Sequence, residues 1–272
     1  MMRNILKNKQ GLIGLVMILT VIIVAVLAPY IAPNNPNEVD ISHKFLEGND
    51  KFPLGTDQLG RCIISRLMYG ARFSLFIALT VLIILIIISV TLGITTAYFG
   101  GIVDYIFQSI CNIFICFPPL VVVLALSGFL GSSIKSLIIS FVLSMWVWFV
   151  KVIRSYVLIE KNKDYIISSR LAGCSDKQII FNHILPNIAP SLVVYFSTSI
   201  GALILMLSGY AFLGVGLDTN TPEWGSMLSN GKTYLYASKA LIVYPGLCIL
   251  YTATGFNLLG EALKDIFAPR GN

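Results

Sequence analysis

The sequence predicts an all-α fold, that of a polytopic membrane protein. Hydrophobic residues make up 56% of the 272 residues and charged residues only 12%, whereas soluble domains are about a quarter charged. The apolar residues gather in long uncharged runs, and about 20 helical residues suffice to cross the hydrocarbon core of a bilayer. The chain therefore has room for about six transmembrane helices.

The uncharged runs give the expected helices in order. They are Leu12–Ile31, Phe73–Tyr98, Tyr105–Phe129, Ile134–Tyr156, Ala189–Leu213 and Ala240–Leu263. Basic residues before the first run imitate a signal peptide, but the uncharged stretch is too long for one, which predicts a retained anchor helix. We expect residues 1–33 to hold the N-terminal tail and first helix, residues 34–72 an extracytoplasmic segment, and residues 73–272 the transmembrane core.

Two of these helices carry interruptions. Pro118 and Pro119 fall inside the third run, where they predict either a simple kink or a bend that lines a pathway. Lys151 and Arg154 fall inside the fourth run, and we expect both to snorkel to the membrane interface because a charge at mid-bilayer is costly. The small residues Ser197, Ser199, Gly201, Ser208 and Gly209 recur along the fifth run and predict close helix packing or a translocation path.

Charge predicts the orientation. An even number of spans places both termini on one side, and that side carries 11 Lys and Arg residues against 8 on the other. The positive-inside rule then predicts that both termini are cytoplasmic. The net charge of +6 is spread over the ends of the apolar runs, which suits membrane lipid and a cytosolic partner and does not indicate nucleic acid.

The loop over residues 158–188 reads as helix, break, helix. Asp164 is expected to cap a first helix that reaches Leu171, and Gly173 to end it in a left-handed conformation. Ser175 and Gln178 form a capping box that opens a second helix. Pro186 is expected to end that helix. The helix carries an apolar stripe that we expect to lie on the membrane surface and to bind a partner, made of Ile179, Ile180, Ile184 and Leu185.

This loop resembles the cytoplasmic loop of ABC importer permeases. The pattern of that family is Glu-Ala-Ala, three residues, Gly, nine residues, a hydrophobic residue, one residue, and Leu-Pro. Gly173, Leu185 and Pro186 match it. The chain departs from it at Ile167 in place of Glu, at Ser168 and Ser169 in place of Ala, and at His183 in place of the hydrophobic residue. The missing Glu removes any salt bridge that it would make with the ATPase.

Three further segments are similar to the second, C-type permease of peptide and nickel importers. They are Phe52–Leu75, in which Cys62 replaces the usual Asp, Phe212–Leu228, and Tyr244–Arg270. The resemblance implies the type I, MetI-like fold of ABC importer permeases and a place in the bacterial plasma (inner) membrane. It also implies a heteromeric complex with a second permease subunit, two cytosolic ATPase subunits and an extracytoplasmic solute-binding protein.

The resemblance assigns roles to particular residues. The ATPase-coupling loop would use Ile167, Ser168, Ser169, Gly173, Ser175, Asp176, His183, Leu185 and Pro186. Pro222, Glu223 and Trp224 are candidates for an outer gate or for docking of the binding protein, and the alternative is a surface turn. The Gly-x-x-x-x-Gly spacings at Gly209 and Gly255 lack the Lys of a P-loop. We therefore expect no enzyme activity and no bound cofactor, with ATP and Mg used by the partner ATPases.

The solute remains open at this stage. The segments Met145–Ser155 and Ser208–Gly214, the second of which lacks the acidic residue of peptide permeases, resemble the nickel branch more than the peptide branch. A metal site within the chain is not expected, because His43 and His183 are predicted on opposite sides of the membrane, and Cys111 and Cys116 do not share a helical face. The five cysteines are read as small hydrophobic residues.

Two alternatives come from other functional classes. An ion-coupled secondary carrier ordinarily needs ionisable residues inside its spans, and the first, second and sixth runs have none in their apolar cores. An intramembrane enzyme needs a nucleophile with its base, or His and acidic metal ligands, within the bilayer. No His, Asp or Glu lies in the apolar core of any expected span.

Overall fold

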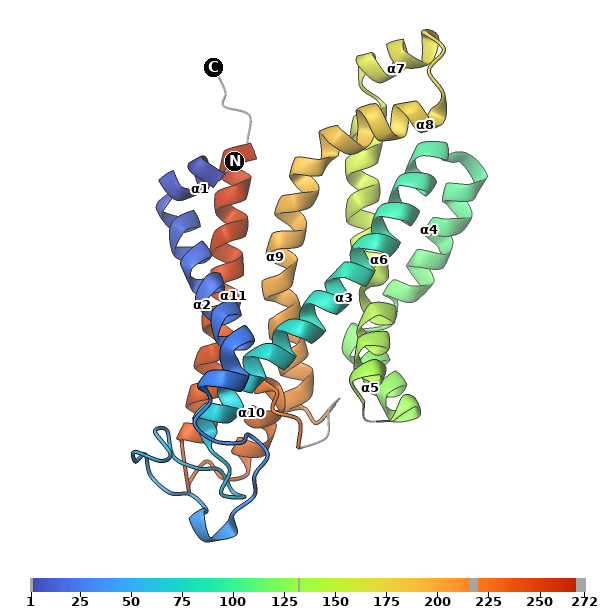
Figure 1. Cartoon of the computed structure of the whole chain (residues 1–272). Helices are drawn as coiled ribbons and strands as arrows, with labels where there is room; N and C mark the ends of the chain where they lie inside the picture. Colours follow the sequence, from blue (N-terminus) through green and yellow to red (C-terminus); the bar gives the residue numbers. More distant parts are fainter. Residues whose placement is uncertain (1, 132, 216–219, 268–272) are drawn as a thin grey trace.

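The computed structural model describes residues 2–131, 133–215 and 220–267. The regular structure in these ranges is helical, and the β structure that they hold is one isolated bridge between Thr56 and Cys62. Figure 1 shows α1 (Met2–Lys7), α2 (Lys9–Ile31), α3 (Ile63–Phe99), α4 (Gly101–Ile115), α5 (Pro119–Leu130), α6 (Ile134–Lys161), α7 (Asp164–Leu171), α8 (Asp176–Gln178), α9 (Leu185–Phe212), α10 (Trp224–Lys232) and α11 (Ala240–Phe267). A 3₁₀ turn, Ile41–His43, precedes α3, and a π-helical turn, Ile179–Ile184, joins α8 to α9. The all-α prediction is confirmed.

Among the described residues, five helical segments are long and apolar enough to cross a membrane: α2, α3, α6, the run from α8 through α9, and α11. The bent pair of α4 and α5 passes the same test when its halves are taken together, which gives up to six spans, as predicted. Helix α7 lies at the same end of the bundle as α1 and the last turn of α11, and α10 lies at the opposite end (Figure 1). We call these the α7 end and the α10 end.

The third expected helix is broken and not merely kinked. Helix α4 ends at Ile115, α5 begins at Pro119, and the two axes differ by 80°. Pro118 has an extended ψ of 131°, the conformation that a residue preceding proline favours. The prediction of one helix over Tyr105–Phe129 is therefore wrong. The role of the bend in lining a pathway stays a prediction.

Helix α3 begins earlier than its uncharged run. It starts at Ile63, ten residues before the expected start at Phe73, and runs for 37 residues. Arg66, inside its first turns, is 1% exposed, and its Nε lies 3.8 Å from an oxygen of Asp57. The same carboxylate pairs with Nε of Arg61 at 2.7 Å. One buried carboxylate thus lies beside both cations, and Nη1 of Arg66 also donates to the carbonyl of Pro36 at 3.0 Å, where the helix extends into the charged segment that precedes the span.

The two basic residues of α6 have polar partners on α4. Arg154 forms two hydrogen bonds to Asp104 of α4, from Nε to Oδ1 at 2.8 Å and from Nη2 to Oδ2 at 2.6 Å. Nζ of Lys151 donates to Oδ1 of Asn112 at 2.8 Å. A bidentate pair between Arg and a carboxylate is among the strongest polar contacts in proteins. These bonds join α4 to α6, and the snorkelling of Lys151 and Arg154 to the membrane interface stays a prediction.

Small residues bring the spans into close contact. Helix α11 packs against both α2 and α9. A Cβ atom at Gly14 would lie 2.8 Å from the carbonyl oxygen of Gly255, and one at Gly201 would lie 2.9 Å from that of Ala253. The packing role predicted for the small residues of the fifth helix is thus confirmed at Gly201. Gly209 has no atom within 4 Å of such a position.

Candidate functional sites at the two ends of the helix bundle

The loop between α6 and α9 has the predicted helix–break–helix form. Helix α7 ends at Leu171, and Gly173 follows with φ of 84°, which an L side chain adopts only with strain. The capping box is present, since the amide of Ser175 donates to Oε1 of Gln178 at 2.8 Å and the amide of Gln178 donates to Oγ of Ser175. The prediction for Asp164 is wrong. Lys163 occupies the N-cap position, and Asp164 is the first residue of α7.

The second loop helix does not end at Pro186, contrary to the prediction. Helix α8 continues through the π-helical turn into α9, and Pro186 lies in the first turn of α9. The amide of Leu185 donates to the carbonyl of Ile180, five residues back. A proline is tolerated in the first turn of a helix, where its missing donor is not needed. The π-helical turn before Pro186 thus lets the chain continue without a break into the span.

The apolar stripe of the loop packs against protein and does not lie on the membrane surface as expected. Ile166, Ile179 and Ile184 are each at most 1% exposed. They share a core with residues from the nearby ends of α3 and α6, namely Ile94, Ala97, Tyr98, Ile153 and Val157. Ile180 and Leu185 pack against the same core. The loop is therefore anchored to two spans at once.

The opposite face of the loop is exposed. Of the residues predicted to couple to an ATPase, Ile167, Ser168, Gly173, Ser175, Asp176 and Pro186 are exposed, and Ser169, His183 and Leu185 are half-buried. The sequence analysis missed Leu171, which is 84% exposed, and Phe181, which is 63% exposed. Ile167 and Leu171 lie four residues apart, on one face of α7, and this spacing was the available signal. Exposed apolar residues on an anchored loop are typical of a docking surface.

Polar contacts also hold the loop in place. The hydroxyl of Tyr165 donates to Oε1 of Glu160 and accepts from Nδ2 of Asn187 at 3.0 Å. Partial burial and the neighbouring carboxylate raise the pKa of Tyr165 to about 12. Tyr165 therefore remains protonated, and able to donate, throughout the physiological range. This contact joins α7 to the last turn of α6 and the first turn of α9.

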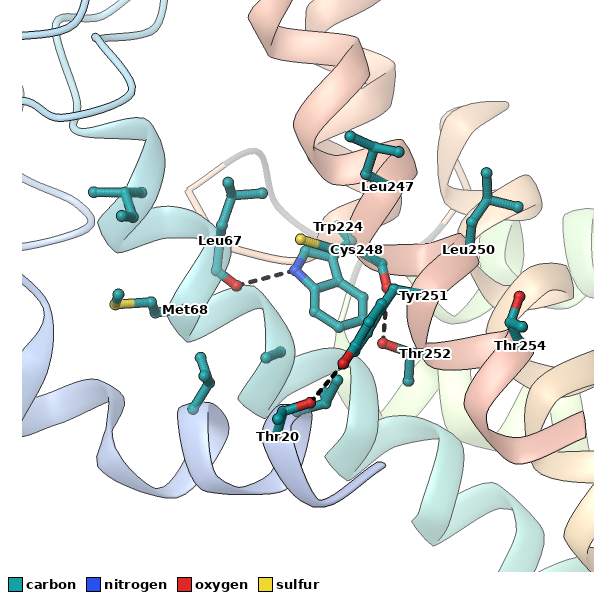
Figure 2. A pocket seen from close by; sticks show the side chains of 14 residues that line it. Thr20, Leu67, Met68, Trp224, Leu247, Cys248, Leu250, Tyr251, Thr252 and Thr254 are labelled. Carbon is teal, nitrogen blue, oxygen red and sulfur yellow. Dashed lines mark hydrogen bonds between the residues drawn. The ribbon is translucent and has the colours of Figure 1, made fainter. Parts of the chain in front are cut away.

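At the α10 end, the predicted gate residues are buried. Pro222 is buried, Glu223 is 1% exposed and Trp224 is 2% exposed. Nε1 of Trp224 donates to the carbonyl oxygen of Leu67 in α3 at 3.0 Å, as Figure 2 shows. A Cβ atom at Gly70 would lie 2.6 Å from Cδ1 of Trp224, so only glycine admits the ring. The alternative of a surface turn is wrong, whereas a role in gating or docking stays a prediction.

Glu223 is the N-cap of α10. Its carboxylate accepts hydrogen bonds from the amides of Gly225 at 2.9 Å and Ser226 at 2.7 Å. Oγ of Ser74 in α3 donates to the same carboxylate at 3.1 Å. Burial raises the pKa of Glu223 above its usual value, and the three hydrogen bonds lower it by less. The side chain thus both caps α10 and ties it to α3.

A cavity of about 730 Å³ lies beside Trp224, between α2, α3 and α11 (Figure 2). Its lining is mostly apolar. The polar groups include Thr20 and Tyr251, whose hydroxyls lie 2.9 Å apart. A second cavity, of about 420 Å³, lies between α6, α9 and α11 and is lined by uncharged residues that include Thr198, Ser199 and Asn257. Neither lining has the carboxylate, imidazole or cationic groups that hydrolytic or ion-relay chemistry uses.

The structure separates the two histidines. His43 contacts Asp40 before α3 at 2.5 Å, whereas His183 lies in the π-helical turn at the α7 end. Hydrogen bonds from Ser42 and His43 hold the pKa of Asp40 below its usual value. Cys111 is buried in α4, whereas Cys116, the residue that follows the end of α4, is exposed. In the ranges that the structure describes, no group of three His, Cys, Asp or Glu residues could hold a metal ion.

The fold and the loop define a class of protein, a polytopic helical membrane protein that presents an anchored loop between two of its spans. Comparison with protein families identifies which one. Residues 89–271 match the binding-protein-dependent transport system inner membrane component, and residues 1–48 match the N-terminal transmembrane domain of oligopeptide transport permease C. The chain belongs to this family of ABC importer permeases, whose members work with ATPase and binding-protein partners.

The chain is also similar to individual permease proteins. The chain is 34% identical to a dipeptide transport system permease protein of Haemophilus influenzae, over 97% of this chain and 92% of the relative. It is 33% identical to a di/tripeptide transport system permease protein of Pseudomonas aeruginosa, over 97% and 89%. It is 30% identical to a nickel transport system permease protein of Escherichia coli, over 94% and 93%. The division of the chain at residues 34 and 73 stays a prediction, and α3 runs across its second border.

Proposed function

We propose that this chain is one of two different permease subunits of an ATP-driven importer. Two ATPase subunits would bind the α7 end, and an extracytoplasmic binding protein would deliver solute to the α10 end. The chain itself hydrolyses no ATP and binds no cofactor, since ATP and Mg belong to the partner ATPases. Membership of the importer permease family supports the proposal.

The proposal rests on one observation, that the loop between α6 and α9 has one buried face and one exposed face. Its buried face, with Ile179 and Ile184, is packed against α3 and α6, whereas Leu171 and Phe181 project from the opposite face. A partner that bound the exposed face would therefore move two spans together as a rigid body. Because Ile167 replaces the family's Glu, we infer that this contact depends more on apolar burial than on a salt bridge.

Charge supports the proposed orientation, with both termini and the α7 end in the cytoplasm. The expected inner segments carry 11 Lys and Arg residues and the outer segments 8. Among the outer cations, Arg61 and Arg66 are buried beside Asp57. Two inner cations are paired as well, Arg154 with Asp104 and Lys163 with Glu160, so the proposed orientation rests on the larger number of Lys and Arg residues in the inner segments.

Two observations bear on the solute, and they point to different classes. The dipeptide relative is 34% identical and the nickel relative 30% identical, which supports a short peptide. The segment Ser208–Gly214 lacks the acidic residue of peptide permeases, which supports a nickel chelate. We propose a short peptide as the first candidate and a nickel chelate as the second. The binding protein would make most of the distinction between them.

The test is reconstitution of the full complex in proteoliposomes. The chain would be co-expressed with its partner permease and ATPases, and uptake of a radiolabelled dipeptide would be compared with uptake of a radiolabelled nickel chelate. We expect uptake to require both ATP and the binding protein. Uptake driven by a proton gradient without the ATPases would contradict the proposal.

A pair of glycine variants tests the coupling role of the loop. Gly173 and Gly131 have φ of 84° and 79°, and neither has an atom within 4 Å of a Cβ position. Proline cannot adopt this backbone conformation, so Gly173→Pro and Gly131→Pro impose similar local strain. We expect Gly173→Pro to abolish ATP-driven uptake and Gly131→Pro to retain most of it. Equal loss in both variants would remove the argument for coupling through the loop.

A further inference from the structure

Helix α3 reaches both candidate sites. Its 37 residues span about 55 Å at 1.5 Å per residue. Near its start, it binds α10 through the carbonyl of Leu67 and the hydroxyl of Ser74. Its last turn contains Tyr98, which contacts the loop at the α7 end. A displacement of the loop could therefore reach α10 along one continuous helix, provided that α3 is held to the loop.

Tyr98 makes that connection. Its side chain is buried in the core that anchors the loop, with 5% of the residue exposed. Its hydroxyl donates to Oδ1 of Asp176, the first residue of α8, at 2.6 Å. The guanidinium carbon of Arg170, in the last turn of α7, lies 5.6 Å from the centre of its ring. Tyr98 thus contacts the loop helices on both sides of the break at Gly173.

The hydrogen bond differs in kind from the packing around it. Contacts among Ile94, Ile179 and Ile184 are apolar and non-directional, so they hold the loop against α3 without pairing particular atoms. A hydrogen bond to a carboxylate is directional and stronger than a neutral one. The hydrogen bond between Tyr98 and Asp176 therefore adds to this packing a directional contact that fixes the position of α8 along α3.

We propose that Tyr98 is a positioning residue for transport, which makes α3 follow the loop through its hydrogen bond to Asp176. When the ATPases close, the loop would move, and α3 would carry that movement to Glu223 and Trp224 at the other end. The inference rests on the proposed function, which it extends by naming the contact that transmits the motion. Without this hydrogen bond, ATP hydrolysis would continue but would drive less transport.

The experiment compares Tyr98→Phe with the wild-type chain in the reconstituted complex. The ring and its packing remain, and only the hydroxyl is lost. We expect solute moved per ATP hydrolysed to fall about ten- to hundredfold, the range that loss of one hydrogen bond to a charged group gives. Binding-protein-stimulated ATP hydrolysis should stay near the wild-type rate. An unchanged transport ratio, or a parallel loss of hydrolysis and transport, would overturn the proposal.

A double-mutant cycle ties the effect to this contact. Asp176→Ala should lower the transport ratio as Tyr98→Phe does, and the double variant should be no worse than either single variant. Asp176→Asn keeps an acceptor oxygen and should restore part of the ratio. Tyr105→Phe is the matched control, because Tyr105 is 74% exposed and its hydroxyl makes no hydrogen bond to a described residue. Additive effects of the two single variants would show that the two side chains do not act through a shared hydrogen bond.

Hydrogen exchange tests the contact independently of transport. In the purified complex, Tyr98→Phe should raise amide exchange over residues 176–180, and Tyr105→Phe should not. Unchanged amide exchange in Tyr98→Phe would show that the hydrogen bond from Tyr98 does not hold α8, even if the importer runs on ATP. Conversely, a wild-type complex without ATP-driven uptake would defeat the proposed function, whereas the exchange result would still decide whether Tyr98 holds α8.

Discussion

The two ends of the bundle use their candidate residues in opposite ways. At the α10 end, Trp224 is 2% exposed and Glu223 is 1% exposed, and both are bonded to α3. At the α7 end, Leu171 is 84% exposed and Ile167 is 51% exposed, while the isoleucines beneath them hold the loop. The difference teaches that residues at the α10 end act through the chain's own packing, whereas those at the α7 end are available to another chain.

One glycine at each end of the bundle shows the same difference. Gly70 is required for space, because a Cβ atom there would clash with Trp224. Gly173 is required for conformation, because its φ is 84° and its surroundings are open. Substitutions at the α10 end should therefore change the stability of the chain, and those at the α7 end should change coupling. Four predictions test this contrast, in order of their expected effect on stability.

The largest effect is expected for Trp224→Ala. Removal of a fully buried Trp leaves a cavity beside the existing one, and such truncations cost about 3–5 kcal/mol. Thermal unfolding in detergent would measure the loss. Trp148→Ala is the control, since Trp148 is 47% exposed on α6. If both variants unfolded at the same temperature, the packing role of Trp224 would be refuted.

The second prediction concerns pH. Burial raises the folded-state pKa of Glu223 above its usual value of 4.5, so the folded chain retains this proton at a pH where the unfolded chain has lost it. The stability that Glu223 contributes is therefore full below about pH 4.5 and falls as pH rises through the folded-state pKa, by at most about 1.4 kcal/mol per pH unit.

Comparison of unfolding in wild type and Glu223→Gln across this range isolates the effect. The Gln variant should lose this part of the slope, because its side chain does not titrate. Glu38→Gln, at an exposed position between α2 and α3, should keep the wild-type slope. An identical pH dependence in all three chains would show that the buried carboxyl does not take up a proton on folding.

A smaller, local effect is expected for Ser175→Ala. The substitution removes half of the capping box, and loss of an N-cap side chain costs about 1 kcal/mol. Because α8 lies in a loop, amide exchange over residues 176–180 should rise without a change in the global unfolding temperature. Ser168→Ala, at an exposed position within α7, should leave this exchange unchanged. A fall in global stability instead would mean that the loop is part of the folding core.

The smallest effect on stability is expected for Leu171→Ser. An exposed position contributes about 0.5 kcal/mol or less to folding. Affinity for the ATPases should nevertheless fall about tenfold, because burial of one Leu side chain at an interface contributes about 1.5–3 kcal/mol. Co-purification titrations would measure the affinity. Leu235→Ser, 42% exposed just beyond α10, should leave ATPase binding intact. Normal ATPase binding by Leu171→Ser would remove this residue from the proposed interface.

Local signals were readable from the sequence. The uncharged runs predicted the number of spans, because the length of hydrocarbon to be crossed depends on the bilayer and not on the partners of each helix. Gly173 and the pair of Ser175 and Gln178 were predicted correctly, since turn and cap chemistry involves residues at most four positions apart. The family pattern in the loop indicated the proposed coupling surface for the same reason.

Contacts between distant residues could not be read in this way. Arg154 and Asp104 lie 50 positions apart, and Ser74 and Glu223 lie 149 apart. A pattern that marked Arg154 as a charge near a helix end could not reveal the acid beside it on another helix. Likewise, the Pro-Glu-Trp segment read equally well as a surface turn until α3 was seen to cover Trp224.

By itself, the sequence determined the class of protein, the spans and the chemistry of the loop, because each depends on composition or on neighbours along one helix. Only the tertiary structure decided which face of the loop is buried, that Glu223 and Trp224 are enclosed, and that Tyr98 meets Asp176. The physical reason is that burial and pairing depend on which helices pack together, and an apolar stripe does not specify its partner.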